Sequence, residues 1–340
     1  MEEDKKLYPM VFSALQDEYS WGSEEFKLAD LGYRDSPVRG GWLATNTISE
    51  VMETYLDRVV GEGIYNVYGR QFPVCVRHIR CHGRMPLRVH PDDETAAERW
   101  DALGKHKVWY VLRAGKDARL HIGFRQQTDA SQLFPACLDG SVTGLLNTVA
   151  PHAGQCFAIA PGTVHAAEGD IEILEIAQSS AMDFCLCGWG EEVSAEEFDS
   201  SLTLVDALDF IDYKAWKPAA APKGSLAQVP QFKVTSLPLN GAVKVRAGSE
   251  ECFSLYSCIS GEASVQIEVL GQKALFPLEN GRTMLVPAEV TEFYIVPTAP
   301  GTVLLETVCT AEPAPDSYID PSAEPTLPGE DDPSRNDFAD

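Results

Sequence analysis

Short apolar segments separated by turn residues recur along much of the chain. Four of them, at residues 108–112, 120–124, 155–160 and 172–177, follow an apolar, β-branched segment at 72–79. Strands this short and this closely spaced predict an antiparallel barrel or jelly roll, not a parallel sheet with crossover helices. Residues 144–149 are expected to cross between the two sheets of that barrel.

Residues 228–310 contain a second group of short apolar segments, at 253–259, 263–269, 283–287 and 302–308. Residues 261–263 and 285–288 resemble residues 154–156 and 159–162, which indicates a distant internal repeat. The chain is therefore predicted to be mainly β, with a second barrel that lacks the histidine present at position 165 in the first.

Helical segments are predicted around these strands. Thr47 and Glu50 form a capping-box pattern, and apolar residues follow at 51, 55, 56 and 59, so one amphipathic helix is expected to begin there. A second helix is expected between Asp92 and Leu103, ended by Gly104. Further helix starts occur at 194–197 and 203–206, before a proline-rich linker at 218–222.

These patterns divide the chain into four parts. Residues 1–190 are predicted to form the first barrel domain with its helical insertion, 191–227 a helical segment and linker, and 228–310 the second barrel. Residues 311–340 form a tail with nine acidic residues, six prolines and one arginine. That composition cannot bury a core and predicts disorder.

The overall charge narrows the class of partner. A formal net charge of −24 repels nucleic acid and anionic membranes, so we expect a small-molecule ligand and neither of those partners. An anionic ligand would require arginine or lysine to be concentrated locally. No signal-peptide pattern and no apolar run of membrane-spanning length occur, which predicts a cytoplasmic protein. Nine cysteines without a Cys-x-x-Cys pattern predict reduced thiols.

Four motifs carry the candidate chemistry. They are Leu87–Glu94, Gly104–Leu112, Gly154–Ala166 and Glu175–Ser180. The first contains His90, followed by Pro-Asp-Asp-Glu, and the third contains His165. In this order and spacing the motifs resemble the short bacterial type I phosphomannose isomerases, over about residues 8–310.

This resemblance implies a fold of two cupin (jelly-roll) β-barrels with helical insertions, and a sugar-phosphate cleft at the open end of the first barrel. It also implies a zinc ion and the interconversion of mannose 6-phosphate and fructose 6-phosphate. His90 and His165 correspond to zinc ligands of the family. Lys105 and Glu175 are the matching active-site positions and the candidate catalytic residues.

The sequence departs from the family at decisive positions. Arg88 and Lys107 stand where the family has its other two zinc ligands, and a protonated arginine or lysine has no lone pair to donate. Two histidines fall short of the three protein ligands usual in catalytic zinc sites. His106 or His152 would have to supply a third ligand, although nothing in their spacing favours this. The sequence thus argues against a zinc cofactor without excluding it.

The catalytic arginine of the family is replaced here by Cys185. A thiol cannot supply the fixed positive charge of a guanidinium group. The pair Cys185 and Cys187 is interpreted as apolar packing, and Trp109 and Tyr110 as barrel wall rather than as a platform for a sugar.

Two interpretations of the substituted positions remain open. Arg88 and Lys107, together with Lys105, would leave positive charge where the metal was and bind a sugar phosphate. Alternatively, Arg88 and Lys107 pair with Glu175 or another local carboxylate and merely fill the site.

Three functions are therefore weighed. The first is a degenerate isomerase homologue that binds mannose 6-phosphate or fructose 6-phosphate with little or no turnover, as a sensor or in an oligomer with an active paralogue. The second is an active metal-dependent isomerase that moves protons through Glu175 or Lys105. The third is a non-catalytic scaffold or interaction protein.

Overall fold

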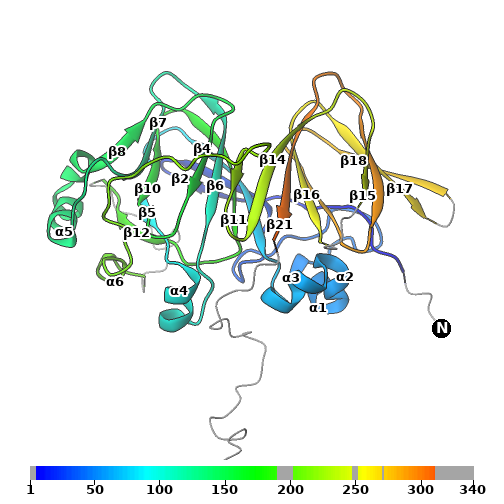
Figure 1. Cartoon of the computed structure of the whole chain (residues 1–340), viewed down its shortest axis with the longest axis horizontal. Coiled ribbons are helices and arrows are strands. Elements are labelled where there is room, and N and C mark those ends of the chain that lie inside the picture. The colour runs from blue at the N-terminus through cyan, green and yellow to red at the C-terminus, as the bar shows by residue number, and fades with distance from the viewer. Residues whose placement is uncertain (1–4, 190–201, 247–251, 270–271, 311–340) are drawn as a thin grey trace, which may run out of the picture.

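Two antiparallel β-barrels lie side by side in the computed structural model (Figure 1), which describes residues 5–189, 202–246, 252–269 and 272–310. The predicted mainly β fold is confirmed. The expected helix start at 194–197 and the acidic tail at 311–340 lie outside the described residues.

The first barrel is built from a six-stranded and a five-stranded sheet. The six-stranded sheet contains, in spatial order, β2 (Leu15–Tyr19), β3 (Gly22–Leu28), β4 (Val74–Cys81), β11 (Ile171–Gln178), β6 (Lys107–Ala114) and β9 (Cys156–Ile159). The five-stranded sheet contains β12 (Phe184–Cys187), β5 (Leu87–Val89), β10 (His165–Glu168), β7 (Arg119–Phe124) and β8 (Leu146–Val149). The strands expected at 72–79, 108–112, 120–124, 155–160 and 172–177 are all present, within a few residues of the expected ends.

The second barrel has a six-stranded and a four-stranded sheet. The first of these contains β1 (Met10–Val11), β19 (Thr283–Val286), β16 (Ser254–Ser260), β21 (Val303–Cys309), β14 (Phe232–Pro238) and β13 (Ala227–Gln228). The other contains β15 (Val243–Arg246), β20 (Glu292–Pro297), β17 (Ala263–Val269) and β18 (Gln272–Leu278).

The start of the chain belongs to the second barrel, not to the first. Met10 pairs with Leu285 and Val11 with Met284, so β1 extends the sheet of a barrel that begins more than 200 residues later in the sequence. This pairing differs from the expected division, which assigned residues 1–190 to one domain. A two-residue edge strand carries no sequence signal for its partner, because any exposed strand edge can accept it.

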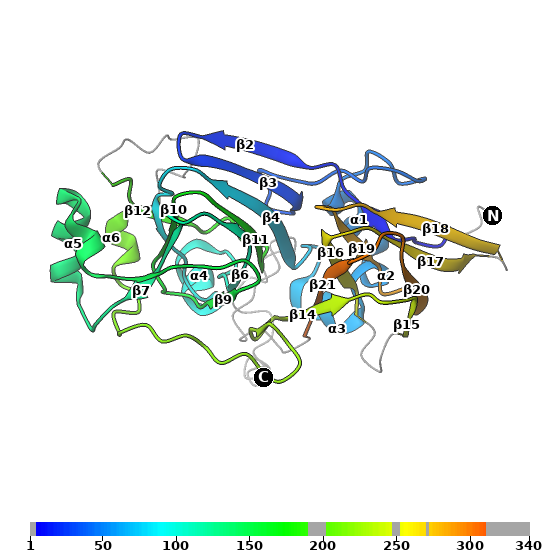
Figure 2. The ribbon, with the colours of Figure 1, turned by 90° about the horizontal axis from the view of Figure 1, so that it is seen from above.

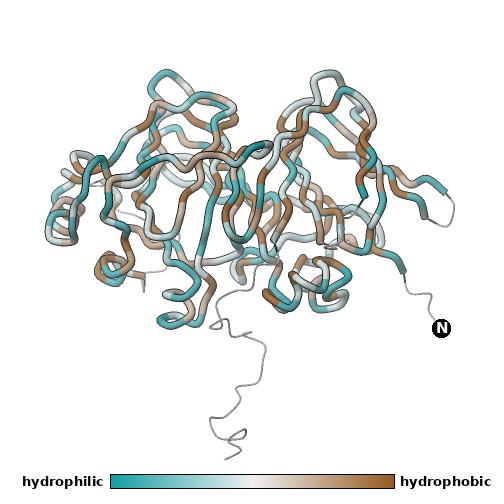
Figure 3. Tube along the Cα trace, in the orientation of Figure 1, coloured by the Kyte–Doolittle hydropathy of each residue, from teal (hydrophilic) through white to brown (hydrophobic). Residues whose placement is uncertain are grey.

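Strands β4 and β11 lie on the side of the first barrel that faces the second (Figure 2). Both are buried on both faces: one face lines the first barrel and the other packs against the second. Apolar residues therefore occur on both faces of each strand, and the charged residues among them are paired with neighbouring side chains. Hydrophobic residues follow the strands of both barrels, whereas the outer turns are hydrophilic (Figure 3).

Three short helices close the space below the second barrel (Figure 1). They are α1 (Ile48–Tyr55), α2 (Asp57–Val60) and α3 (Glu62–Tyr68). The predicted capping box at α1 is confirmed, since Thr47 accepts from the backbone N–H of Glu50 and the Glu50 side chain accepts from that of Thr47. The expected single helix is nevertheless broken at Leu56, whose φ of 50° interrupts the helical backbone.

The remaining helices belong to the first barrel. They are α4 (Asp93–Trp100), α5 (Ala130–Asp139), the 3-10 turn η1 (Ser141–Gly144) and α6 (Leu204–Ala207). Asp92 caps α4, as its acidic first turn indicated, but the helix ends at a left-handed Asp101 and not at Gly104. Among the described residues, no helix is long and apolar enough to cross a membrane.

Candidate functional site

Backbone hydrogen bonds bring the four sequence motifs together at one end of the first barrel. The N–H of Gly162 donates to the carbonyl of His90, and that of Lys105 donates to the carbonyl of Pro91. The N–H of Gln178 donates to the carbonyl of His106. Segments that are far apart in sequence thus have their side chains directed at a common point.

His90 and His165 lie next to each other at this point. His90 follows β5 and His165 opens β10, which pairs with β5. Their ring centroids are 5.2 Å apart, and both side chains are completely buried. Neither ring nitrogen of His90 has a hydrogen-bond partner among the described residues.

The surroundings of His165 fix its tautomer. Its Nδ1 lies 2.9 Å from the carbonyl oxygen of Thr163, which can only accept, so Nδ1 carries the proton. Nε2 is then a lone-pair acceptor, and it lies 3.2 Å from Nζ of Lys107. Burial, followed by the charge of Lys107, lowers the pKa of His165 to about 3, so the ring stays neutral at physiological pH.

Lys107 is the centre of the arrangement. Its ammonium group is fully buried and donates to Asp183 Oδ1 at 2.8 Å as well as to His165 Nε2. Glu175 Oε2 completes its surroundings at 3.8 Å. One imidazole nitrogen and two carboxylates therefore surround a cation that the chain itself supplies.

Lys105 occupies the neighbouring position. Its Nζ lies 2.6 Å from Asp183 Oδ2, so a single carboxylate holds both lysines. Burial lowers the pKa of Lys105 to about 8, partly offset by Asp183. Asp183 is the most exposed member of the group, with 15% of its side chain accessible, so the cluster is open to solvent on its side.

Two buried arginines complete the cluster, and one of them, Arg77, also lies 3.6 Å from Asp183. Arg77 donates from Nε to Glu175 Oε1 at 2.6 Å and from a terminal nitrogen to Glu24 Oε2 at 2.8 Å. Arg88 donates to the other oxygen of Glu24 at 2.7 Å. The indole N–H of Trp109 donates to Glu175 Oε2 at 2.7 Å, so this residue is barrel wall and also a hydrogen-bond donor to the cluster.

The charges in this cluster nearly balance. The cations are Arg77, Arg88, Lys105 and Lys107, and the carboxylates are Glu24, Glu175 and Asp183. With both histidines neutral, one positive charge is left over. Removing one partner from such a buried network typically costs about 3–5 kcal/mol, because it leaves an uncompensated charge.

Three members of the cluster escaped sequence reasoning. Arg77 stands within the apolar run of β4, where a buried charge needs a partner, and that contrast was an available signal. Glu24 lies in β3 and Asp183 directly precedes β12, and neither belongs to a motif. Only the pairing of distant strands places them beside the lysines.

The residues present do not fit a zinc ion in this arrangement. The unpartnered ring nitrogens of His90 would suit a metal ion. The place such an ion would take beside His165 Nε2 is, however, occupied by the ammonium group of Lys107, which also binds Asp183. Within the described part of the chain, no three His, Cys, Asp or Glu side chains are arranged to hold a metal. His106 contacts Gln178 and His152 is exposed, so neither completes the set.

Cys185 pairs in the sheet with Arg88, close to the cluster. The resemblance places the catalytic arginine at the position of Cys185, on β12. In this protein the fixed positive charges come instead from Arg77 on β4 and Arg88 on β5.

Comparisons with known proteins agree with this fold. No protein-family model matches the sequence. Mannose-6-phosphate isomerase ManA from Bacillus subtilis is 25% identical over 313 residues, which cover 84% of this chain and 95% of the relative. Mannose-6-phosphate isomerase from Streptococcus mutans is 24% identical over 228 residues, covering 64% of this chain and 68% of the relative.

The fold is also found among solved structures. The crystal structure of mannose 6-phosphate isomerase from Bacillus subtilis superposes with a TM-score of 0.75, at 20% identity, over 88% of this chain and 99% of that one. The shared double barrel and the curated relatives together confirm the predicted resemblance. The chain is thus similar in sequence to curated mannose-6-phosphate isomerases and shares its double-barrel fold with a solved one.

Proposed function

We propose that this protein binds a sugar phosphate at the mouth of the first barrel and does not isomerise it. The observation that carries the proposal is the cluster of four cations and three carboxylates around His90 and His165. Its excess positive charge stands out in a chain with a net charge of −24. The substrate class comes from the curated relatives, which are named for mannose 6-phosphate.

The proposed absence of turnover is supported by one of the two candidate catalytic residues, Glu175. Burial alone would raise the pKa of Glu175, but Arg77 and Lys107 outweigh it and lower the pKa to about 2. Both oxygens of Glu175 are also held, one by Arg77 and the other by Trp109. A carboxylate this weakly basic and this firmly bonded is a poor general base.

Anion binding relies on the open side of the cluster. A phosphate group entering beside Asp183 would take over part of the contact that this carboxylate makes with the buried ammonium groups of Lys105 and Lys107. Charge-assisted hydrogen bonds from two such donors are the strong kind. Lys105 is the residue to change in a binding test, because its partner Asp183 is the most exposed member of the cluster. Arg88 is paired with the buried Glu24.

Calorimetric titration tests the proposal. We expect mannose 6-phosphate or fructose 6-phosphate to bind the metal-stripped protein, and the affinity to fall at least tenfold in Lys105→Met. Lys244→Met is the matched control, because Lys244 lies on the second barrel and pairs there with Glu292. In a coupled assay we expect no isomerisation with or without added zinc.

The active-isomerase alternative makes the opposite prediction. Zinc-dependent turnover that disappears in His90→Ala would overturn the proposal in its favour.

A scaffold role is the second candidate, and one observation favours it. Every cation of the cluster already has a carboxylate partner, and apart from Asp183 the members are almost completely buried. This agrees with the interpretation that Arg88 and Lys107 merely fill the site. No heat with either sugar phosphate would support this candidate against ligand binding.

A further inference from the structure

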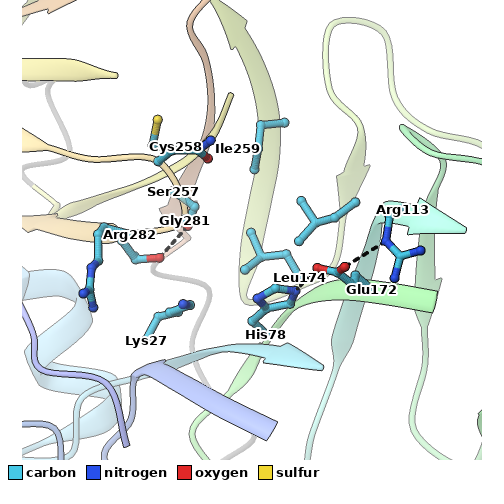
Figure 4. Close-up of a pocket in the computed structure, with 13 residues that line it drawn as sticks. Lys27, His78, Arg113, Glu172, Leu174, Ser257, Cys258, Ile259, Gly281 and Arg282 are labelled. Atoms are coloured by element: carbon cyan, nitrogen blue, oxygen red, sulfur yellow. Dashed lines mark hydrogen bonds and ion pairs between the residues drawn. The ribbon is translucent and has the colours of Figure 1, made fainter. Parts of the chain in front are cut away.

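A cavity lies between the two barrels, separate from the cluster around His90 and His165. Its volume is about 240 Å³ (Figure 4). The first barrel contributes residues from β3, β4, β6 and β11, and the second contributes β16 and the turn that leads into β19. Lys27 and Arg282 lie toward one end of the cavity, and Arg113 and Glu172 toward the other.

Positive charge is in excess at the end that holds Lys27 and Arg282. Lys27, only 7% exposed, pairs with Glu25 at 2.6 Å, but Arg80 shares that carboxylate at 3.1 Å. Among the described residues, the carboxylate that Arg282 contacts is Glu279, at a long 3.9 Å, and Arg39 shares it at 3.1 Å. Two carboxylates thus serve four cations along this seam.

The far end of the cavity is neutralised internally. Arg113 bonds to Asp170 and Glu172, and His78 lies 3.0 Å from Glu172. These acids take up the charge of Arg113, so this end offers no comparable attraction for an anion. The asymmetry fixes the direction in which a charged ligand would lie.

A pair of buried hydroxyl groups adds a hydrogen-bond donor. Ser257 Oγ and Thr283 Oγ1 are 2.8 Å apart, and both residues are almost fully buried. The pair carries two hydroxyl hydrogens and uses one of them between its members. The other is available to an acceptor in the cavity. Leu112, Leu174 and Ile259 provide an apolar wall.

We propose that this cavity binds a small organic anion, with its carboxylate or phosphate group between Lys27 and Arg282 and its carbon skeleton against the apolar wall. The volume corresponds to roughly eight water molecules, which fits a ligand of about ten non-hydrogen atoms. Because Lys27 belongs to the first barrel and Arg282 to the second, such a ligand would hold the barrels together and stabilise the folded protein.

Hexanoate and glycerol 3-phosphate test the two sources of negative charge, and 1-hexanol is the uncharged control. At low ionic strength we expect one of the anions, and not the alcohol, to bind the full chain with one-to-one stoichiometry in a calorimeter. The same anion should raise the midpoint of thermal unfolding.

Charge-removing variants locate the binding. We expect the affinity to fall at least tenfold in Lys27→Met and in Arg282→Met. It should be unchanged in Arg246→Met, which removes an exposed charge from the second barrel. Arg282 is partly exposed, so its variant remains informative if Lys27→Met does not fold. Binding should also persist in Lys105→Met, which separates this cavity from the cluster in the first barrel.

Two results would overturn the proposal. One is that neither anion binds. The other is that an anion binds equally well to wild type, Lys27→Met and Arg282→Met.

Discussion

Lys107 is the single residue that most changes the chemistry of the first barrel. A buried ammonium with an imidazole nitrogen and two carboxylates around it meets the same kinds of groups that a zinc ion would bind. The difference is that its charge is covalently attached and cannot accept a lone pair from a substrate oxygen. The site therefore keeps a positive centre and loses a Lewis acid.

Replacing Arg88 and Lys107 by side chains that can ligate should create a metal site. In Arg88→Gln/Lys107→Glu the cluster would hold two cations and four carboxylates, with His90 and His165 free to ligate. We expect this variant to bind cobalt(II) with new visible absorption bands and to be stabilised against heat by added zinc.

The single variant Lys107→Met is the control for that experiment, because it removes the cation without adding a ligand. Its affinity for cobalt should remain well below that of the double variant. Equal metal affinity in wild type and the double variant would contradict the role assigned to Lys107.

Asp30 makes the stability of the folded protein depend on pH, independently of the cluster. Burial raises its pKa to about 6, against the hydrogen bond from the backbone N–H of Phe72. The folded protein therefore holds this proton more tightly than the unfolded chain does. The resulting stability is fully present below the unfolded pKa of 3.8 and is lost as the pH rises through 6.

Asp30→Asn removes this titration and retains an acceptor for Phe72. We expect the free energy of unfolding of the variant, relative to wild type, to rise by roughly 1 kcal/mol between pH 5 and pH 7.5. Urea unfolding of both proteins at the two pH values measures this change in the difference between their free energies of unfolding. A difference between the two proteins that does not change with pH would show that Asp30 is not buried as an acid.

At the scale of elements, the contact between α4 and the start of β6 positions two site residues. Gly104 approaches the backbone of Asp92 and Asp93 so closely that a Cβ atom would lie 2.2 Å from the carbonyl carbon of Asp92. The same contact allows Lys105 to donate its N–H to Pro91, beside His90. Position 104 therefore requires a glycine because of this close contact, and not because the helix α4 ends there.

Gly104→Ala should accordingly lower the free energy of unfolding by about 1–3 kcal/mol, the usual cost of overpacking. It should also weaken any ligand binding that depends on Lys105. Gly144→Ala is the matched control, because nothing lies within 4 Å of its added methyl group. Denaturant unfolding of both variants provides the comparison, and equal stability of the two would refute the close contact.

The short elements illustrate the limits of reading the sequence alone. The capping boxes at Thr47 and Thr203 are local hydrogen-bond patterns, and both occur as the sequence indicates. Strands β2 and β3 and the helix α5, which contains Pro135, were not predicted. Gly22–Leu28 holds three charged residues, so its burial could not be inferred without the arginines that neutralise it.

At the scale of the whole molecule, one hydrophobic cluster spans the junction of the two barrels, while the interior of the first barrel forms clusters of its own. Val76 and Ile176 of the first barrel belong to the same cluster as Phe253 and Leu285 of the second, together with the helices α1–α3. The cavity between the barrels lies along this junction, where the apolar contact gives way to charged side chains.

The sequence by itself determined the number of barrels, about half of their strands, the helix caps and the resemblance to mannose-6-phosphate isomerases. Each of these depends on residues close together in the chain, through hydrophobic periodicity, capping and motif spacing. Through the resemblance it also assigned six residues to one predicted site: Arg88, His90, Lys105, Lys107, His165 and Glu175.

Only the tertiary structure decided what surrounds those six residues. Glu24, Arg77 and Asp183 join the cluster because distant strands pair and buried charges must be compensated. The assignment of β1 to the second barrel and the seam of cations between the barrels are decided in the same way. Long-range strand pairing and electrostatic compensation leave no local pattern in the chain, so they became visible only in the folded protein.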